Sequence, residues 1–282
     1  MNEVPLVSIL MTAYNREKYI AEAIKSVLAS SYENFELIIV DDTSKDKTVK
    51  IAREYTEKDS RIQLYINEKN LGQFPNRNKA AGFAKGWLIF WVDSDDTIKA
   101  DAIEYVVEQF KANPAVNFST IYKKGDIQVP TVLNAEESIR HNFFKEGFLN
   151  IGPGGTVIKT EYFKVIGGFP EKYGPIGDKY YNVKAAANTS ILLLPYDYLN
   201  YRRHEGQEIN NSFSYLCDGY RYLADLMQRS DLPLTMQEKK SILKKSARAN
   251  FLSFLRNIKN TGEIKKTYQA FKISGIQLKD LM

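Results

Sequence analysis

The first 120 residues alternate apolar runs of strand length with segments of helical pattern, and this alternation limits the possible folds most. The apolar runs are VSILMTA, FELIIV, RIQLYI and WLIFWV, which begin at residues 7, 35, 61 and 87. The intervening segments EKYIAEAIKSVLAS, residues 47–58 and NRNKAAGFAKG have helical pattern, and DAIEYVVEQFKAN follows the last run. Strands that are apolar on both faces and separated by single helices indicate a parallel sheet covered on both sides. The sequence therefore predicts a doubly wound α/β sandwich.

Beyond residue 120 the pattern changes twice. It weakens between residues 125 and 150, then returns as the short apolar runs GTVIKT and SILLLP. From Phe213 onward it is helical only, with breaks at 231–233 and 261–262. Leu243, Ala247, Phe251, Phe254 and Leu255 are expected on one apolar helix face. We predict an α/β domain over 1–212, with halves of about 1–120 and 121–212, and a C-terminal helical extension over 213–282.

Composition places the chain among globular proteins of a reducing compartment. Its 282 residues contain one cysteine, Cys217, which excludes a disulfide framework and is expected to be a small buried apolar residue. No apolar run approaches the roughly 18 residues of a membrane span, and the N-terminal run has no basic segment before it. We therefore expect a cytoplasmic protein.

The positive charge is concentrated in the predicted extension. Residues 213–282 contain 13 Lys and Arg against 6 Asp and Glu, so they carry +7, whereas the whole chain carries +5. The first 212 residues therefore have a net charge of −2. A basic helical segment of this kind favours contact with an anionic membrane or a partner chain, and helices that simply cover the α/β domain are an equal alternative.

Three carboxylates stand almost side by side at the end of the most apolar run. WLIFWV leads directly into Asp93, Asp95 and Asp96. Like charges this close repel, and a partly desolvated carboxylate is disfavoured unless a cation or hydrogen-bond donor compensates it. The stretch therefore predicts a positive partner that the stretch itself does not supply.

Polar side chains also follow the other predicted strands. Thr12 and Tyr14 come at the end of the first run, and Asp41 and Asp42 at the end of the second. Each alone is an ordinary turn or helix-capping residue. Ligands of open α/β sheets bind beyond the carboxyl ends of the strands, where these residues would meet. Together they predict an edge that stacks a base and holds a metal-bound diphosphate.

Five motifs in order resemble the family-2 glycosyltransferases of the GT-A fold. They are VSILMTAYN, ELIIVDDTS, NLGQFPNRNKAAG with WVDSDD, VIGGFPEKYGPIGDKYY, and YRRHEGQEINNS. The resemblance covers about residues 6–212. Any one motif is weak, but five on the predicted elements are specific at the level of the family.

The resemblance implies a role for the acidic stretch. In this family the D-x-D carboxylates bind Mn²⁺ or Mg²⁺, which bridges to the diphosphate of a nucleotide sugar. Asp95 matches the metal-binding carboxylate, Asp93 the residue near ribose and metal, and Asp96 a neighbouring or helix-capping position. Hard carboxylate oxygens suit these ions. His204, in the YR-x-H position, is a further candidate metal ligand, with a structural or solvated histidine as the alternative.

The resemblance also implies nucleotide, acceptor and catalytic positions. Asp178 matches the catalytic base, although the family commonly has Glu-Asp where this chain has Gly177-Asp178; a loop aspartate is the alternative. The remaining matched residues are Thr12, Tyr14, Asp42, Arg77, Asp93 and Ser94 for a uridine nucleotide, Arg202 and Arg203 for a loop over the diphosphate, and Gly154, Gly155 and Thr156 for the acceptor side.

The sequence thus predicts an inverting, metal-dependent transferase that uses a nucleotide-sugar donor, with UDP-sugar favoured. The acceptor would be a saccharide or lipid-linked saccharide of surface polysaccharide synthesis, reached at the inner face of the cell membrane. No nucleic acid is expected as a partner, and oligomerisation stays open. Two alternatives remain: a catalytically silent nucleotide-sugar-binding or scaffold domain, and a nucleotidyltransferase. The second is disfavoured because no Gly-rich phosphate loop follows the first strand.

Overall fold

The computed structural model describes residues 4–124, 126–205, 207 and 212–281, and its contacts divide the chain into two compact units. The first unit comprises residues 1–134, 151–169 and 189–202, and the second comprises 135–150, 170–188 and 203–282. The sequence predicts a domain boundary at residue 212, and this boundary stays a prediction. Parts of the YRRHEGQEINNS motif lie outside the described residues.

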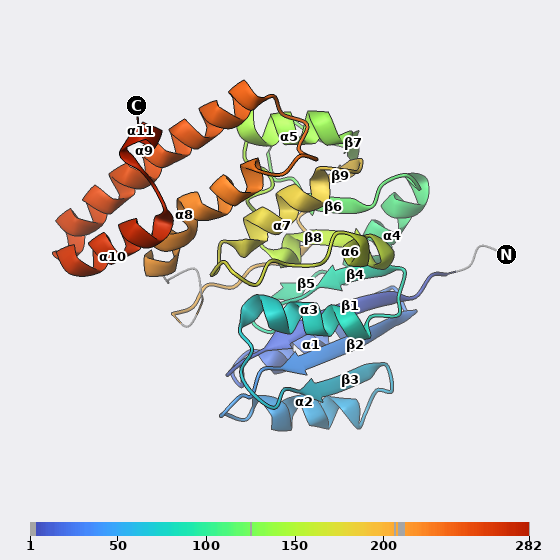
Figure 1. Ribbon diagram of the computed structural model, residues 1–282. Coiled ribbons are helices and arrows are strands. Elements are labelled where there is room, and N and C mark those ends of the chain that lie inside the picture. Colours follow the sequence, from blue (N-terminus) through green and yellow to red (C-terminus); the bar gives the residue numbers. More distant parts are fainter. Residues whose placement is uncertain (1–3, 125, 206, 208–211, 282) are drawn as a thin grey trace. The chain divides into compact units, whose positions relative to one another are not determined.

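The first unit is built on a mixed, mostly parallel sheet (Figure 1). Its strand order is β3-β2-β1-β4-β8-β6-β9-β7, and only the pairs made by β8 and β7 are antiparallel. The strands are β1 (Val7–Ala13), β2 (Phe35–Asp41), β3 (Ile62–Ile66), β4 (Leu88–Trp91), β6 (Phe118–Ile121), β7 (Thr131–Leu133), β8 (Thr156–Lys159) and β9 (Ile191–Leu194). The predicted doubly wound, mostly parallel sheet is confirmed.

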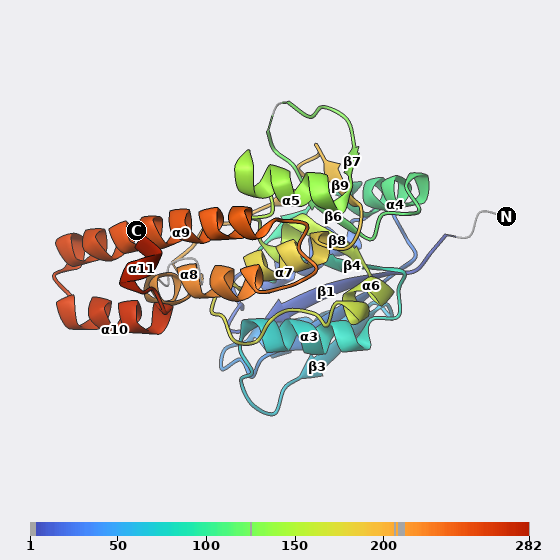
Figure 2. The same cartoon turned by 45° about the horizontal axis from the view of Figure 1, so that its top comes forward.

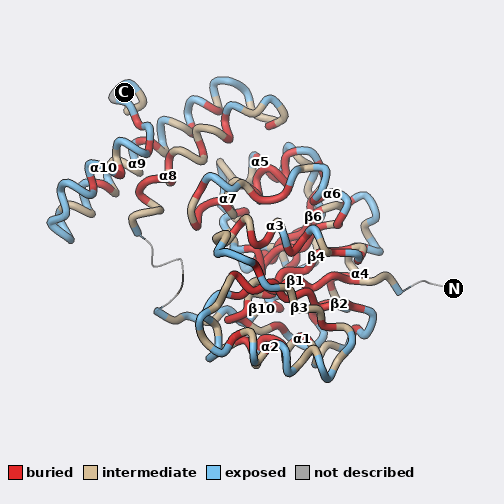
Figure 3. Tube along the Cα trace, turned by 60° about the horizontal axis from the view of Figure 1, so that its bottom comes forward, coloured by how far each residue is buried: buried red, intermediate tan, exposed pale blue. Residues whose placement is uncertain are grey.

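Helices cover both faces of this sheet because its strands are apolar on both sides (Figures 1 and 3). One face packs on α1 (Ile20–Leu28), α2 (Thr48–Thr56) and α4 (Ala102–Ala112), in a core that includes Ile9, Leu37 and Phe90. The other face contacts α3 (Gln73–Phe83) and α6 (Thr160–Val165). There Trp91 packs on Phe163 and Phe169, with ring centroids 5.9 and 5.3 Å apart.

A second, two-stranded sheet follows the acidic stretch. β5 (Thr97–Ile98) pairs antiparallel with β10 (Leu199–Asn200). The short 3₁₀ helix η1 (Pro153–Gly155) leads into β8. This pairing brings residues near 200 next to the end of β4, which sequence separation alone would not suggest.

The second unit is helical throughout its described elements. It contains α5 (Ala135–Phe144), α7 (Gly177–Ala186), α8 (Ser212–Met227), α9 (Met236–Thr261), α10 (Ile264–Ser274) and α11 (Leu278–Leu281). Thr235 caps α9 through a capping box with Glu238, and Gly262, with φ of 70°, ends it. The predicted break at 231–233 lies in the connection between α8 and α9, and the break at 261–262 is the end of α9.

The helices α8, α9 and α10 pack on one another through a small apolar core (Figure 2). Ala247 and Phe254 of α9 are buried in it, and Leu243 and Phe251 are partly buried. Leu255, which the sequence predicts on the same face, is instead 50% exposed. Cys217 is buried in this core, as predicted. Of the helices in the described part of the chain, none has the length and apolarity of a membrane-spanning segment.

Candidate functional site

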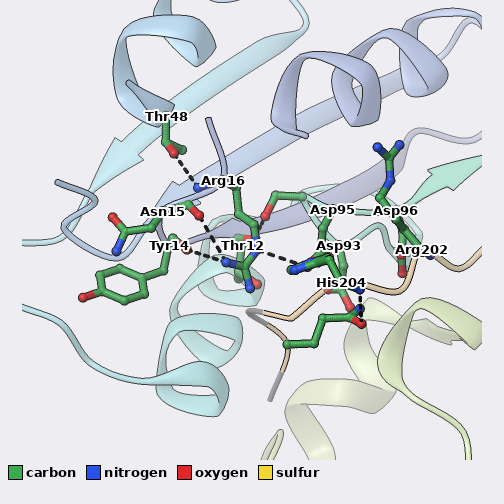
Figure 4. A network of polar contacts seen from close by, with 12 residues as sticks. Thr12, Tyr14, Asn15, Arg16, Thr48, Asp93, Asp95, Asp96, Arg202 and His204 are labelled. Carbon is green, nitrogen blue, oxygen red and sulfur yellow. Dashed lines mark hydrogen bonds and ion pairs between the residues drawn. The ribbon is translucent and has the colours of Figure 1, made fainter. Parts of the chain in front are cut away.

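The carboxyl ends of β1, β2 and β4 lie side by side because these strands are parallel neighbours. Ala13 pairs in register with Asp41, and Leu10 pairs with Trp91. The residues that follow β1 and β4 therefore lie at one edge of the sheet (Figure 4). The Ser94 hydroxyl donates to the Thr12 carbonyl at 2.8 Å and links the ends of β4 and β1.

The three aspartates of the acidic stretch form one cluster. Asp93, Asp95 and Asp96 each offer a carboxylate oxygen, and these oxygens lie within 4.8 Å of one another. Asp96 is 2% exposed, and burial together with the charge of Asp93 raises its pKa to about 7. The Arg202 backbone N–H donates to its carboxylate at 2.8 Å. The cluster is therefore a site that favours cations.

Two arginines supply the positive charge that the acidic stretch lacks. The Arg77 guanidinium pairs with Asp93, and Arg16 Nε lies 3.0 Å from Asp95 Oδ2. The Arg77 side chain is only 4% exposed and stands over the Trp91 ring at 5.6 Å. Among the described residues, its Nε and Nη1 have no hydrogen-bond partner. Buried donors of this kind suit an anionic or carbonyl-bearing ligand.

Arg16 is the site residue that sequence reasoning missed. It follows Tyr14 and Asn15 at the end of β1, and its side chain reaches the acidic cluster (Figure 4). One arginine after a strand carries no periodic signal, and the compensating charge lies 79 positions from the carboxylate that it contacts. Only the uncompensated negative charge of Asp93, Asp95 and Asp96 indicated that a cationic side chain was needed nearby.

Asp42 is engaged by the protein itself. Its Oδ1 accepts from the Leu71 N–H at 2.8 Å and from Asn67 Nδ2 at 2.7 Å. Its Oδ2 accepts from the Gly72 N–H at 2.9 Å. The carboxylate thus fixes the loop that leads into α3, the helix that carries Arg77. Tyr14, by contrast, is 44% exposed and free to offer a ring face.

The loops after β1 and β2 contain backbone that non-glycine residues rarely adopt. Asn15 has φ of 53° and Thr43 has φ of 64°. Hydrogen bonds join the two loops, since the Asn15 N–H donates to Ser44 Oγ at 2.8 Å and Lys45 N–H donates to Asn15 Oδ1 at 2.8 Å. Such strain persists where surrounding contacts enforce it, and it is concentrated at functional edges.

The residues matched to the acceptor side are packed against the protein. Gly154 and Gly155 are buried, and a Cβ at Gly155 would lie 2.2 Å from Ile151 Cδ1. A Cβ at Gly154 would lie 3.2 Å from Leu199 Cδ2. Thr156 is buried at the start of β8 and donates to the Pro153 carbonyl at 2.9 Å. A side chain at either glycine would displace Ile151 or Leu199, so glycine allows close packing before the start of β8.

Arg202 directs its side chain away from the cluster that its backbone contacts. Its Nη2 lies 2.6 Å from Glu22 Oε2 on α1, and its guanidinium stands 5.1 Å from the Tyr19 ring centroid. Arg203 is exposed and belongs to the second unit. The His204 N–H donates to Gln207 Oε1 at 3.1 Å within that unit.

Asp178 lies in the first turn of α7 in the second unit. The Lys179 N–H donates to its Oδ1 at 2.6 Å, and a helix N-terminus favours negative charge. The pKa of Tyr222 on α8 is raised to about 12, first by the burial of Tyr222 and then by the negative charge of Asp178. The loop before α7 is tied to α8, because Asp218 Oδ2 accepts from the Gly174 N–H at 3.0 Å.

The chain belongs to glycosyl transferase family 2, since the model of that family matches residues 8–166. Its sheet has the architecture of GT-A glycosyltransferases. The S. aureus TarS 1–349 structure in complex with UDP-GlcNAc superposes with a TM-score of 0.74 at 21% identity, covering 95% of this chain and 79% of that one. The Pyrobaculum calidifontis mannosyltransferase PcManGT, in complex with GDP-Man and Mn²⁺, gives 0.67 at 18% identity, covering 99% and 78%.

Curated relatives match over part of their length. The putative teichuronic acid biosynthesis glycosyltransferase TuaG of Bacillus subtilis is 34% identical over 145 residues, or 50% of this chain and 57% of that protein. An uncharacterized glycosyltransferase, MJ1057, of Methanocaldococcus jannaschii is 35% identical over 57% of this chain and 58% of its own. The match spans little more than half of these relatives' lengths.

Proposed function

We propose that this chain is an inverting glycosyltransferase that moves one sugar from a nucleotide-diphosphate donor to a saccharide or lipid-linked saccharide. The observation that carries the proposal is the cluster of Asp93, Asp95 and Asp96 at the carboxyl edge of the sheet, beside Arg16 and Arg77. The match to family 2 supports this interpretation of the carboxylates. UDP-sugar is favoured because TarS is seen with UDP-GlcNAc, and surface polysaccharide synthesis because TuaG is named for it.

The donor set fits a divalent ion. Three carboxylates offer hard oxygen ligands within 4.8 Å of one another, as Mn²⁺ and Mg²⁺ require. Asp93 and Asp95 would hold the ion, with Asp96 behind them and His204 as a further candidate ligand. When bound, the ion would neutralise the diphosphate and the charge that develops as it leaves.

The chain's own residues are assigned as follows. The Tyr14 ring stacks on the base, while Thr12, Asp42, Arg77 and Ser94 surround the nucleoside. Arg203, together with Arg202 once its side chain leaves Glu22, would neutralise the diphosphate. Gly154, Gly155 and Thr156 would shape the acceptor side.

Asp178 is the proposed general base. As the acceptor hydroxyl oxygen attacks C1 of the sugar, the C1–O bond to the diphosphate breaks and the leaving group takes its electron pair. The hydroxyl proton passes to the Asp178 carboxylate. Attack from the face opposite the diphosphate inverts the anomeric centre.

Peripheral contact with an anionic membrane is the second part of the proposal. One face of α9, which is described throughout, carries exposed basic and apolar side chains at intervals of three or four residues, hence on one side of the helix. Leu252 and Leu255 on this face are each 50% exposed. We define the α9 basic face as Lys244, Lys245, Arg248, Leu252, Leu255, Arg256 and Lys259.

This composition suits an anionic bilayer. The only acidic residue of α9 is Glu238, in its first turn, so the α9 basic face has no negative charge of its own. Lysine and arginine attract anionic headgroups, while exposed leucines between them gain by entering the headgroup boundary. A soluble polyanion would use the charges but leave the leucines in water. The bilayer therefore explains both kinds of side chain.

A donor panel tests the proposed activity. The protein would be incubated with UDP-, GDP- and dTDP-sugars in Mn²⁺, with nucleotide release and sugar-containing products both measured. We expect release of UDP from one UDP-sugar and its acceleration by a saccharide acceptor. Binding without release would favour the silent scaffold, and formation of nucleotide sugar from sugar phosphate and nucleoside triphosphate would favour the nucleotidyltransferase.

A further inference from the structure

The Arg16 guanidinium pairs with Asp95, the carboxylate that a metal ion would also bind. Its Nε donates to Asp95 Oδ2 at 3.0 Å, and its Nη1 donates to the carbonyls of Tyr14 and Asn15 at 3.0 and 3.2 Å (Figure 4). The side chains of Arg16 and Asp95 are 21% and 11% exposed. The guanidinium therefore neutralises the very carboxylate that the proposed function gives to the metal.

We propose that Arg16 stands in for the divalent ion at Asp95 and exchanges that carboxylate for the donor's diphosphate when the ion binds. The inference rests on the proposed function and adds a residue that the family motifs did not assign. A guanidinium and a divalent ion repel each other at one carboxylate, so binding of the ion weakens the pair between Arg16 and Asp95. A released guanidinium then favours the doubly charged diphosphate, which arginine binds well.

The local backbone allows this exchange because it is held without the side chain. The Arg16 N–H donates to Thr48 Oγ1 at 2.7 Å, and the Arg16 carbonyl accepts from the N–H groups of Tyr19 and Ile20 at 3.0 and 2.9 Å. These bonds fix the turn that starts α1. The ion pair to Asp95 can break while the turn stays in place.

Arg77 shows why the exchange is assigned to Arg16 alone. The Arg77 side chain is 4% exposed, lies over Trp91 and belongs to the interior of α3. Breaking its pair with Asp93 would leave the buried guanidinium without a compensating carboxylate, which is costly. Arg16 is the more exposed of the two and is joined to a loop, so its guanidinium is the one that can change partners.

The exchange predicts opposite effects on two affinities. Without nucleotide, Arg16 competes with the ion, so Arg16→Gln should bind Mn²⁺ more tightly, by about 5-fold, the strength of a partly exposed ion pair. With Mn²⁺ present, the variant lacks the cation that pairs with the diphosphate, so its affinity for UDP should fall by roughly 10-fold. A residue that only supports the fold would weaken both.

Titration of Mn²⁺ by electron paramagnetic resonance and of UDP by calorimetry tests this without any turnover. Arg61→Gln is the matched control, since Arg61 also pairs with an aspartate, Asp59, at 2.7 Å, and is expected to change neither affinity. Thermal unfolding of each variant checks that the fold is kept.

The outcomes separate the exchange from the proposed function. If wild type binds Mn²⁺, Asp95→Asn loses it and Arg16→Gln leaves either affinity unchanged or moves it the other way, the exchange is overturned and the metal site stands. If wild type binds no Mn²⁺, or Asp95→Asn binds it as tightly, the proposed metal site fails and the exchange fails with it.

Discussion

Charge balance at the end of β4 is decided by single residues from distant parts of the chain. Asp93 is paired with Arg77, Asp95 with Arg16, and Asp96 accepts the backbone N–H of Arg202. Because the partners come from α3, the end of β1 and the segment after β10, no local pattern could reveal them. The acidic stretch predicted that positive charge must lie near its carboxylates, and Arg16 and Arg77 supply part of that charge.

Replacing Asp178 by Asn should separate chemistry from binding. Asparagine keeps the size of the side chain and the acceptor for the Lys179 N–H, but it cannot take a proton. We expect kcat to fall by roughly 10²- to 10⁴-fold with little change in donor affinity. Initial rates with a responsive donor and acceptor measure this, and near-native turnover would assign the base elsewhere, with Glu171 the next carboxylate to replace.

Lys184 of α7 gives a pH-dependent prediction. Burial, and then the charge of Arg229, lowers its pKa from 10.5 to about 8. Below pH 8 the ammonium is charged in both the folded and unfolded states, so the cost of burying its charge is greatest there. Between pH 8 and 10.5 the folded state releases the proton first, and stability rises with pH.

Lys184→Met should therefore increase the free energy of unfolding at pH 7 by about 1 to 3 kcal/mol. The gain should shrink as the pH approaches 10.5. Denaturant unfolding of wild type and variant at pH 7 and pH 9.5 measures it. A gain that is equal at both values, or a loss at pH 7, would contradict the assignment of a destabilised ammonium.

At the scale of elements, strong apolar runs were predicted well and weak patterns poorly. β1, β2 and β4 came from runs that are buried on both faces, and α1, α2 and α4 from clear periodicity. α5 was not predicted, because AEESIRHNFF buries only Ser138 and Ile139. The insertion of β8 between β4 and β6 is a long-range pairing that local sequence does not encode.

The error at Leu255 has a physical origin in the helix period. Phe254 and Leu255 are adjacent, so their side chains point about 100° apart, and only one of them can enter the core of α8, α9 and α10. Phe254 is 3% exposed and Leu255 is 50% exposed. The five apolar residues therefore cannot all lie on one face of α9.

Two glycines in helical segments should respond oppositely to alanine. Gly82 lies inside α3 with open space around its Cβ position, so Gly82→Ala should stabilise by about 0.5 to 1 kcal/mol. Gly262 ends α9 with φ of 70°, where alanine is strained, so Gly262→Ala should destabilise by about 1 kcal/mol. Thermal unfolding of both variants measures the effect. Equal shifts of the melting temperature would contradict the backbone argument.

At the scale of the whole molecule, charge is divided unevenly along the chain. Residues 213–282 carry +7 and the remainder −2. The α9 basic face should bind vesicles that contain anionic lipid at low salt and release them as salt rises, since each exposed cation contributes about 1 kcal/mol near the surface and is screened. Sedimentation with anionic and neutral vesicles measures this.

Variants of the α9 basic face sharpen that prediction. Lys244→Gln, Lys245→Gln and Arg248→Gln combined should lower binding at least 10-fold, about 1.4 kcal/mol, whereas Gln at Lys50 and Lys58 in the first unit should change it little. Leu252→Ser with Leu255→Ser should weaken binding even at low salt. Binding that survives both sets, or that is equal on neutral vesicles, would remove the membrane from the account.

The most direct test of the central claim is calorimetric titration of a UDP-sugar with and without Mn²⁺, in wild type and in Asp95→Asn. The account predicts that wild type binds only with Mn²⁺ and that Asp95→Asn loses this dependence, while its unfolding stays cooperative because Asp95 lies beyond the apolar strand β4. Asp59→Asn, at an aspartate paired with Arg61, should bind as wild type does. Native, Mn²⁺-dependent affinity in Asp95→Asn would contradict the account.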